Sequence, residues 1–229
     1  MITGAAGGIG RAVVDRFVSE GATVLAVDRV PVAFGSEAVI PVVLDITDET
    51  QWRAFADEHL RPTAVDILVN NAAIGDPGTF LETDADTWDD VLRVNQLGSL
   101  LAVRAVIPGM LGQGAGAIVN ISSIVGAVGM PFSPAYHATK GAIRQLTKHL
   151  TVAYGSRGIR ANTVLPGTIR TPLTEGQAQD RNELFLARTP MGRQGTPPEV
   201  ASAVVFLCSD EASFVNGAEL AVDGGYLAL

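Results

Sequence analysis

Two side chains four residues apart, Tyr136 and Lys140, form a pair that could move a proton. They stand in the stretch "YHATKGA", and on a helix residues i and i+4 share one face. A free tyrosine has a pKa near 10 and is a poor base at neutral pH, but a nearby ammonium stabilises the phenolate and lowers that pKa. The pair could therefore accept or donate a proton, although this spacing alone is also common on helix surfaces without a function.

Ser123 is a candidate partner of this pair. It lies thirteen residues before Tyr136, at the end of the apolar stretch "AIVNISS". In open parallel sheets, ligands bind at the carboxyl ends of the strands, where a hydroxyl could bond a substrate carbonyl or alkoxide. The neighbouring Ser122 should point away from such a site, because side chains alternate along a strand.

A glycine-rich stretch, "TGAAGGIG", occupies residues 3–10. Gly4 allows a sharp turn, Gly8 lets the backbone approach a phosphate, and Gly10 permits a helix to pack closely on a strand. The helix that begins here would direct free N–H groups and its positive dipole end at the phosphates. The spacing predicts a pyrophosphate-binding turn; taken alone, it would also suit a tight turn without a ligand.

Asp28 strengthens that prediction, because it ends the next apolar stretch, eighteen residues after Gly10. A carboxylate at this place can accept hydrogen bonds from the adenosine ribose hydroxyls. The same charge repels a 2′-phosphate, which favours NAD over NADP as the cofactor. Arg29 follows directly and could stack on the adenine or weaken that preference.

Further short motifs extend the pattern over nearly the whole chain. "LDITD" with Asp45, "NNAA", "RVNQLG" with Asn95, "NISS", "YHATK" and "PGTIRT" follow one another in this order. In their order and spacing they resemble the short-chain dehydrogenase/reductase family. The resemblance implies one Rossmann-type domain over residues 1–229 and a nicotinamide-dependent interconversion of a secondary alcohol and a ketone.

The resemblance also implies a role for each residue of the reaction site. Tyr136 would be the acid or base, and Lys140 would lower its pKa and hold the nicotinamide ribose. Ser123 would orient and polarise the reacting oxygen. Asn95 would anchor a water molecule that links Lys140 to a solvent proton relay.

The implied cofactor site is built from several separate segments. Asp45 and Ile46 would flank the adenine, residues 71–73 would lie beside the adenosine ribose, and Ile169 would contact the nicotinamide carboxamide. The complete set of expected cofactor-binding residues is Gly4, Gly8, Ile9, Gly10, Asp28, Arg29, Asp45, Ile46, Asn71, Ala72, Ala73, Tyr136, Lys140, Pro166, Gly167, Ile169 and Thr171. Ala73 stands where the family usually has glycine, which is a small departure.

These residues need a scaffold of alternating strands and helices. Apolar runs rich in Val, Ile and Leu predict strands at 22–28, 39–45, 66–72, 117–123, 160–166 and 219–225, a pattern typical of parallel strands covered on both faces. Helical patterns lie at 10–21, 86–111, 134–156 and from 196 onward. The expected fold is a single-domain, doubly wound parallel β-sheet with helices on both faces, and with a turn or stub over residues 29–38.

The first strand is an exception, because only Met1 and Ile2 precede the glycine turn. By the family's topology this strand lies in mid-sheet, between the second strand and the one that ends in "NNAA". A typical strand has about 5–6 residues. We therefore expect a start several residues upstream of Met1, which intact mass spectrometry of the native protein would test.

The composition is that of a globular protein, with 47% hydrophobic and 17% charged residues. A net charge of −8 argues against non-specific binding to nucleic acid or anionic membranes. The single cysteine, Cys208, excludes a disulfide within the chain. No cluster has metal-ligand spacing, so no metal is expected. Neither a signal peptide nor an apolar run of about 20 residues is evident, and we therefore expect a cytoplasmic protein.

The expected substrate is a small alcohol or ketone. Residues 172–191 should close over the site as a lid, and Ile74, Val125, Met130 and Phe132 should line a mainly apolar substrate site.

By resemblance, a homotetramer or dimer should form through the helices that carry Asn95 and Tyr136. One alternative function is a catalytically silent dinucleotide-binding regulator or scaffold. Another is enoyl reduction or sugar-nucleotide epimerisation, against which the glycine spacing and the place of Ser123 argue.

Overall fold

A parallel β-sheet forms the centre of the molecule in the computed structural model, which describes residues 1–61, 63–175 and 179–229. Within these residues, seven parallel strands pair in the order β3-β2-β1-β4-β5-β6-β7. The strands are β1 Ile2–Thr3, β2 Val24–Asp28, β3 Val39–Val43, β4 Ile67–Asn70, β5 Gly116–Ile121, β6 Ile159–Pro166 and β7 Glu219–Val222. The doubly wound sheet predicted from the alternating pattern is confirmed.

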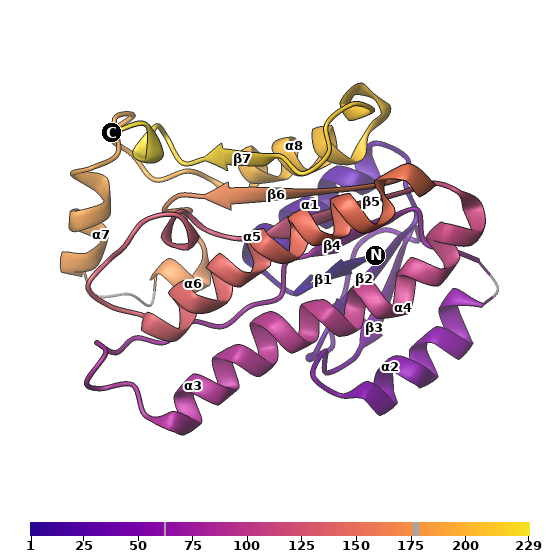
Figure 1. The fold of residues 1–229 in the computed structure, drawn as a ribbon, viewed down its shortest axis with the longest axis horizontal. Coiled ribbons are helices and arrows are strands. Elements are labelled where there is room, and N and C mark those ends of the chain that lie inside the picture. The colour runs from indigo at the N-terminus through magenta and orange to yellow at the C-terminus, as the bar shows by residue number, and fades with distance from the viewer. Residues whose placement is uncertain (62, 176–178) are drawn as a thin grey trace.

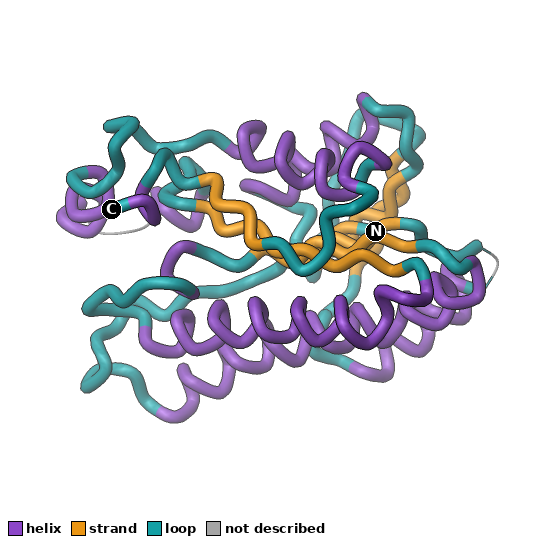
Figure 2. Tube along the Cα trace, turned by 45° about the horizontal axis from the view of Figure 1, so that its top comes forward, coloured by secondary structure: helices purple, strands orange, loops and turns teal. Residues whose placement is uncertain are grey.

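Helices cover both faces of this sheet (Figures 1 and 2). Helices α1 (Gly8–Ser19) and α8 (Pro197–Cys208) pack together on one face. The other face carries α2 (Glu49–Phe55), α4 (Gly98–Gln113) and α5 (Pro134–Tyr154), with α3 (Ala85–Leu92) extending from α4. The short helices α6 (Pro172–Glu175) and α7 (Gln179–Leu186) lie at the end toward which β6 and β7 point.

Among the described residues, two large hydrophobic cores, one on each side of the sheet, hold these layers together. Ile2, Val13 and Leu207 belong to the core between the sheet and α1 and α8. Leu68 and Ile118 belong to the core on the opposite side. Because both faces of the central strands are buried, their sequences are nearly continuous apolar runs.

Strand β1 lies between β2 and β4, as the family's topology implied. Ile2 pairs with Ala26 on one side and with Val69 on the other, and is 1% exposed. Residues 29–38, which connect β2 to β3, contain no helix, so the predicted short connection is confirmed. The glycine turn therefore follows a strand in the middle of the sheet, where its neighbours on both sides also end.

The predicted helix over 86–111 is divided in the structure. A π-helical turn, Arg93–Leu97, separates α3 from α4 and contains Asn95. The continuous run Ala85–Gln113 is long and apolar enough to cross a membrane by length and composition, which corrects the expectation that no run approaches that length. Half of its most apolar window is buried inside the molecule, and core helices of soluble proteins meet the same criteria.

Candidate active site

Contacts within the protein itself hold the glycine turn in place. Gly4 has a φ of +66°, a left-handed conformation that favours glycine. The Asn71 amide donates hydrogen bonds of 3.0 Å to the carbonyls of Thr3 and Gly4. A Cβ on Gly10 would lie 2.0 Å from the Gly4 carbonyl oxygen. Gly10, expected among the cofactor-binding residues, is therefore buried beneath the turn, where it lets the helix approach.

Helix α1 begins directly after this turn and has no side-chain cap. Its first residues, Gly8 and Ile9, line a cavity of about 310 Å³ together with Gly7. Nothing lies within 4 Å of where a Cβ on Gly7 would be. Open space in front of uncapped N–H groups is what a phosphate requires, so these residues fit a dinucleotide cofactor.

Asp28 lies at the end of β2, beside the turn. One carboxylate oxygen accepts a 2.9 Å hydrogen bond from the Ala6 N–H, and the other accepts a 3.3 Å bond from the Val30 N–H. Asp28 lines the first cavity and also a second one, of about 390 Å³. Asp28 is thus oriented by backbone donors and still faces the space that a ribose would fill.

The two cavities adjoin, since both are lined by Gly4, Asp28, Ala72 and Ala73. Most residues expected around the cofactor lie along this double cavity. The second cavity contains Arg29, Asp45 and Ile46, and the first contains Asn71, Tyr136, Lys140, Pro166, Gly167, Ile169 and Thr171. Ile74, expected at the substrate, instead lines the second cavity, which Asp45 and Ile46 also line.

Ser123, Tyr136 and Lys140 meet at the far end of the first cavity. The Lys140 ammonium lies 5.3 Å from the centre of the Tyr136 ring and donates a 2.8 Å hydrogen bond to the Ile121 carbonyl. Ser123 is the N-cap of the 3-10 turn Ile124–Gly126 that follows β5, and its hydroxyl accepts a 3.3 Å hydrogen bond from the Val125 N–H. Strand β5 and helix α5 therefore bring the three side chains together.

Burial dominates the electrostatics of this group. It raises the pKa of Tyr136 to about 12, while hydrogen bonding with Ser123 acts in the opposite direction. Burial also lowers the pKa of Lys140 to about 8. The expected lowering of the tyrosine pKa by Lys140 is therefore not produced by the protein's own groups, because desolvation of the phenolate outweighs it.

Asn95 is 1% exposed and is engaged within the protein. Its amide nitrogen donates to the Ile74 carbonyl (2.9 Å) and to the Thr139 hydroxyl (3.0 Å), and its amide oxygen accepts from the Ile74 N–H (2.9 Å). The Thr139 hydroxyl in turn donates to the Tyr136 carbonyl at 2.9 Å. One amide hydrogen therefore bonds helix α5 through Thr139, and the other bonds the loop after β4 through Ile74. The water molecule expected at Asn95 stays a prediction.

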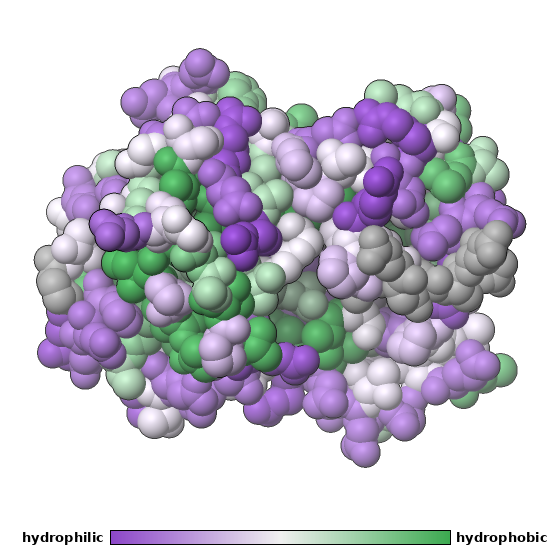
Figure 3. Space-filling model, turned by 180° about the vertical axis from the view of Figure 1, so that it is seen from behind, coloured by the Kyte–Doolittle hydropathy of each residue, from purple (hydrophilic) through white to green (hydrophobic). Residues whose placement is uncertain are grey.

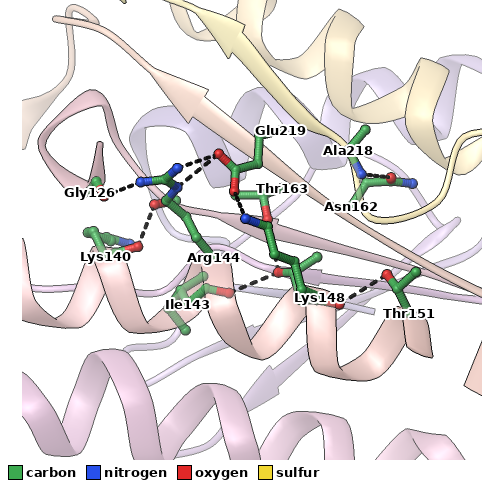
Figure 4. A network of polar contacts seen from close by, with 12 residues as sticks. Gly126, Lys140, Ile143, Arg144, Lys148, Thr151, Asn162, Thr163, Ala218 and Glu219 are labelled. Atoms are coloured by element: carbon green, nitrogen blue, oxygen red, sulfur yellow. Dashed lines mark hydrogen bonds and ion pairs between the residues drawn. The ribbon is translucent and has the colours of Figure 1, made fainter. Parts of the chain in front are cut away.

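A polar network fixes helix α5 to the turn that carries Ser123 (Figure 4). The Ser122 hydroxyl donates to the Lys140 carbonyl at 2.8 Å, which agrees with its predicted structural role. Arg144 donates to the Gly126 carbonyl at 2.5 Å and pairs with Glu219 of β7 at 2.6 Å. These bonds join α5 to β7 and to residues 123–126, the turn after β5 that we call the serine turn.

Three of the four residues expected around the substrate belong to an apolar cluster beside Tyr136. Val125, Met130 and Phe132 belong to it, together with Phe185 and Tyr226. The ring centres of Phe132 and Phe185 lie 5.8 Å apart, those of Phe185 and Tyr226 lie 5.9 Å apart, and the Tyr226 hydroxyl donates to the Met130 sulfur at 3.3 Å.

Phe185 and Tyr226 were missed by the sequence analysis. Phe185 stands within the expected lid, residues 172–191, of which 176–178 lie outside the described residues. Tyr226 lies in the apolar C-terminal stretch, and both rings are 7% exposed within one subunit. The signal available in the sequence was that each is an aromatic residue, Phe185 in a mainly polar segment and Tyr226 in the short C-terminal stretch.

Comparison with known proteins places this geometry among oxidoreductases. A family model described as enoyl-(acyl carrier protein) reductase matches residues 4–227. The 2-(R)-hydroxypropyl-CoM dehydrogenase of Xanthobacter autotrophicus is 40% identical over 256 residues, which cover 100% of this chain and 98% of the relative. The galactitol 2-dehydrogenase (L-tagatose-forming) of Cereibacter sphaeroides is 42% identical over 98% of this chain and 93% of its own.

Solved structures agree in fold over the full length. An oxidoreductase of the short-chain dehydrogenase/reductase family from Burkholderia thailandensis has a TM-score of 0.91 and 39% identity, covering 100% of this chain and 92% of its own. ElxO, solved with NADP bound, has a TM-score of 0.91 and 33% identity, covering 100% of this chain and 98% of its own. Such coverage leaves no large part of the chain without a counterpart.

Proposed function

This chain belongs to the short-chain dehydrogenase/reductase family, and from that premise we propose that Tyr136 exchanges the proton of its reaction with Ser123 and Lys140 as partners. The chain is an NAD(P)-dependent oxidoreductase that interconverts secondary alcohols and ketones, like its dehydrogenase relatives. The observation that carries the proposal is the meeting of these three side chains at one end of the cavity that begins at the helix α1 N-terminus.

In the oxidative direction, Tyr136 takes the hydroxyl proton of the alcohol. The Ser123 hydroxyl donates a hydrogen bond to the reacting oxygen and orients it, and the Lys140 ammonium favours the phenolate. When bound, the nicotinamide cofactor supplies the hydride acceptor or donor. In the reductive direction, Tyr136 returns the proton to the ketone oxygen.

Substitution of the tyrosine tests this assignment. Tyr136→Phe should leave NADH affinity within about twofold and lower kcat by about 10²–10⁴-fold, because the proton acceptor is lost while the cavity keeps its shape. Tyr154→Phe, on the same helix but outside the cavity, should leave kcat unchanged. Full turnover by Tyr136→Phe would refute the role of Tyr136, whereas NADH binding without turnover by the wild type would favour the regulator or scaffold.

The preferred cofactor in this proposal is NAD. The argument is the Asp28 carboxylate, which faces the cavity and would repel a 2′-phosphate. Arg29 lines the same cavity and works against that repulsion. A related structure holds NADP and another was solved with NADH, so the family accommodates both, and a direct affinity comparison is required.

The substrate in this proposal is an apolar secondary alcohol or its ketone. The cluster of Phe132, Phe185 and Tyr226 beside Tyr136 supports that class, because aromatic side chains favour apolar partners. A screen of linear and cyclic secondary alcohols, followed by NADH absorbance, would test it. Activity confined to charged or highly hydroxylated substrates would contradict it.

Assembly as a homotetramer or dimer also belongs to this proposal. A shallow apolar groove on α3, α4 and α5 supports it, lined by Leu92, Leu97, Leu100, Ala142, Ile143 and Leu146 with two polar residues. Burying such a face between two copies would remove Leu100, which is 41% exposed, from water.

A further inference from the structure

The loop after β4 contacts the catalytic helix at its first turn. Asp76, in this loop, is 2% exposed. One of its carboxylate oxygens accepts a 2.9 Å hydrogen bond from the Tyr136 N–H, and the other accepts a 3.2 Å bond from the Ala135 N–H. A buried carboxylate sixty residues earlier in the sequence is therefore bonded to the backbone of Tyr136 itself.

Helix α5 does not cap its own N-terminus. Ser133 occupies the N-cap position but has a φ of +61° and makes no side-chain cap bond. Its hydroxyl donates instead to the Asp76 carbonyl at 2.5 Å, and its N–H donates to the Gly78 carbonyl at 2.8 Å. The cap is supplied by another part of the chain, and the two segments are joined by four hydrogen bonds.

The same loop is fixed to other parts of the site. The Asn95 amide makes two hydrogen bonds to the backbone of Ile74, and Arg181 of α7 donates to the Pro77 carbonyl. Ala72 and Ala73, at the start of this loop, line both cavities. A cap from this loop therefore fixes Tyr136 relative to the cavity wall, which a cap from Ser133 would not do.

We propose that Asp76 is a positioning residue, which holds the first turn of α5 so that the Tyr136 hydroxyl stays aligned with Ser123. The proposal rests on the proposed function of Tyr136. A carboxylate is suited to the task, because it can accept from two N–H groups at once and its charge is favoured at a helix N-terminus. An amide of the same shape would present a donor to one of the two N–H groups.

Asp76→Asn is therefore the informative variant, and Asp84→Asn is its matched control. Asp84 caps α3 by accepting a 2.8 Å hydrogen bond from the Thr87 N–H, and it is exposed and outside the active site. Asp76→Asn should lower kcat by about tenfold or more, because small displacements of reacting groups are costly, and should leave the KM for the cofactor within about twofold. Asp84→Asn should leave kcat unchanged.

Two further readouts separate positioning from general destabilisation. Hydrogen bonding with Ser123 lowers the tyrosine pKa, so its loss in Asp76→Asn should move the rising limb of the oxidation pH profile to higher pH. Amide hydrogen exchange at Ala135 and Tyr136 should become faster in Asp76→Asn and stay unchanged in Asp84→Asn.

Each outcome decides the matter. Wild-type kcat and an unshifted pH limb in Asp76→Asn would overturn the proposal. If Asp76→Asn does not fold, Ser133→Ala is the second variant. It removes the hydroxyl that donates to the Asp76 carbonyl but keeps the Asp76 carboxylate, and it should also lower kcat. An unchanged kcat and pH limb in Ser133→Ala would then overturn the proposal. If the wild type oxidises no alcohol, the proposed function fails, and unchanged amide exchange in Asp76→Asn would separately overturn the role of Asp76.

Discussion

Tyr136 and Lys140 occupy a buried site in which each is shifted toward its neutral form. The pKa of the phenol rises to about 12 and that of the ammonium falls to about 8, both because of burial. A phenol with a raised pKa is a weaker acid than free tyrosine, and its phenolate, although strongly basic, is scarcely populated near neutral pH. The rate of alcohol oxidation therefore depends on what stabilises the phenolate when substrate and cofactor are present.

This shift leads to a prediction about pH. Alcohol oxidation requires the phenolate, whose pKa burial raises to about 12, so its kcat/KM should rise with pH from about 6 to 9 and beyond, whereas ketone reduction requires the phenol, which stays protonated, and should be nearly constant over the same range. Rates measured in both directions across this range would check the difference in slope. Equal slopes in the two directions would indicate that another group controls the proton.

A second prediction concerns the choice between NADH and NADPH and depends on the Asp28 carboxylate. NADH should bind more tightly than NADPH, and Asp28→Asn should strengthen NADPH binding by about tenfold, because roughly 1.4 kcal/mol of repulsion is removed. Fluorescence titration of both cofactors would measure this. Tighter binding of NADPH by the wild type would refute the assignment, and Asp15→Asn, on the exposed surface of α1, serves as a charge control.

Among the elements, α5 is the one that several distant segments hold in place. Glu219 on β7 pairs with Arg144 and Lys148, one and two turns beyond Lys140, and Arg144 also bonds the serine turn (Figure 4). Both members of the Arg144–Glu219 pair have side chains that are about three-quarters buried. Such a pair is more strongly coupled than an exposed one.

Glu219→Gln should therefore weaken the attachment of helix α5 to β7 and, through Arg144, the position of the serine turn. The loss of charge-assisted hydrogen bonds should lower the free energy of unfolding by about 1–3 kcal/mol and should reduce kcat several-fold by freeing the serine turn. Thermal unfolding and steady-state kinetics would measure the two effects. Glu20→Gln breaks the exposed Arg16–Glu20 pair of α1 and should change neither quantity appreciably.

At the scale of the whole molecule, two apolar surfaces are relevant, one to ligand binding and one to assembly. The face seen from behind is hollowed near its middle, with apolar surface on the floor of the hollow (Figure 3). On the opposite side of the sheet, the groove of α3, α4 and α5 offers a second apolar surface. The first surface suits ligands, and the second is the face that we propose for assembly.

A charge placed in that groove tests the assembly. The wild type should form a dimer or tetramer at micromolar concentration, and Leu100→Glu should shift it toward monomer, because a buried unpaired carboxylate is unfavourable in an interface. Light scattering coupled to size exclusion would measure both. Val43→Glu, at a residue that is 60% exposed on the edge strand, should have no effect on mass; a monomeric wild type would remove the expectation.

Local sequence patterns were sufficient to predict the strand–helix alternation, the glycine turn with Asp28, and the shared helix face of Tyr136 and Lys140; that Ser123 acts with them was implied by the family resemblance. Each depends on residues close together in the chain: a run of apolar side chains, a glycine where φ is positive, or a four-residue helical repeat. Parallel strands then bring their ends to one edge. Placement of the main catalytic candidates followed from these rules.

The path of the chain in three dimensions decided the rest. Asp76 meets Tyr136 across sixty residues, Tyr226 meets Met130 across ninety-six, and Glu219 meets Arg144 across seventy-five. No local pattern marks such pairs, because each side chain acquires its partner only when the sheet brings distant loops together. The same physics explains the tyrosine pKa, since burial is a property of the packed molecule and not of the sequence around Tyr136.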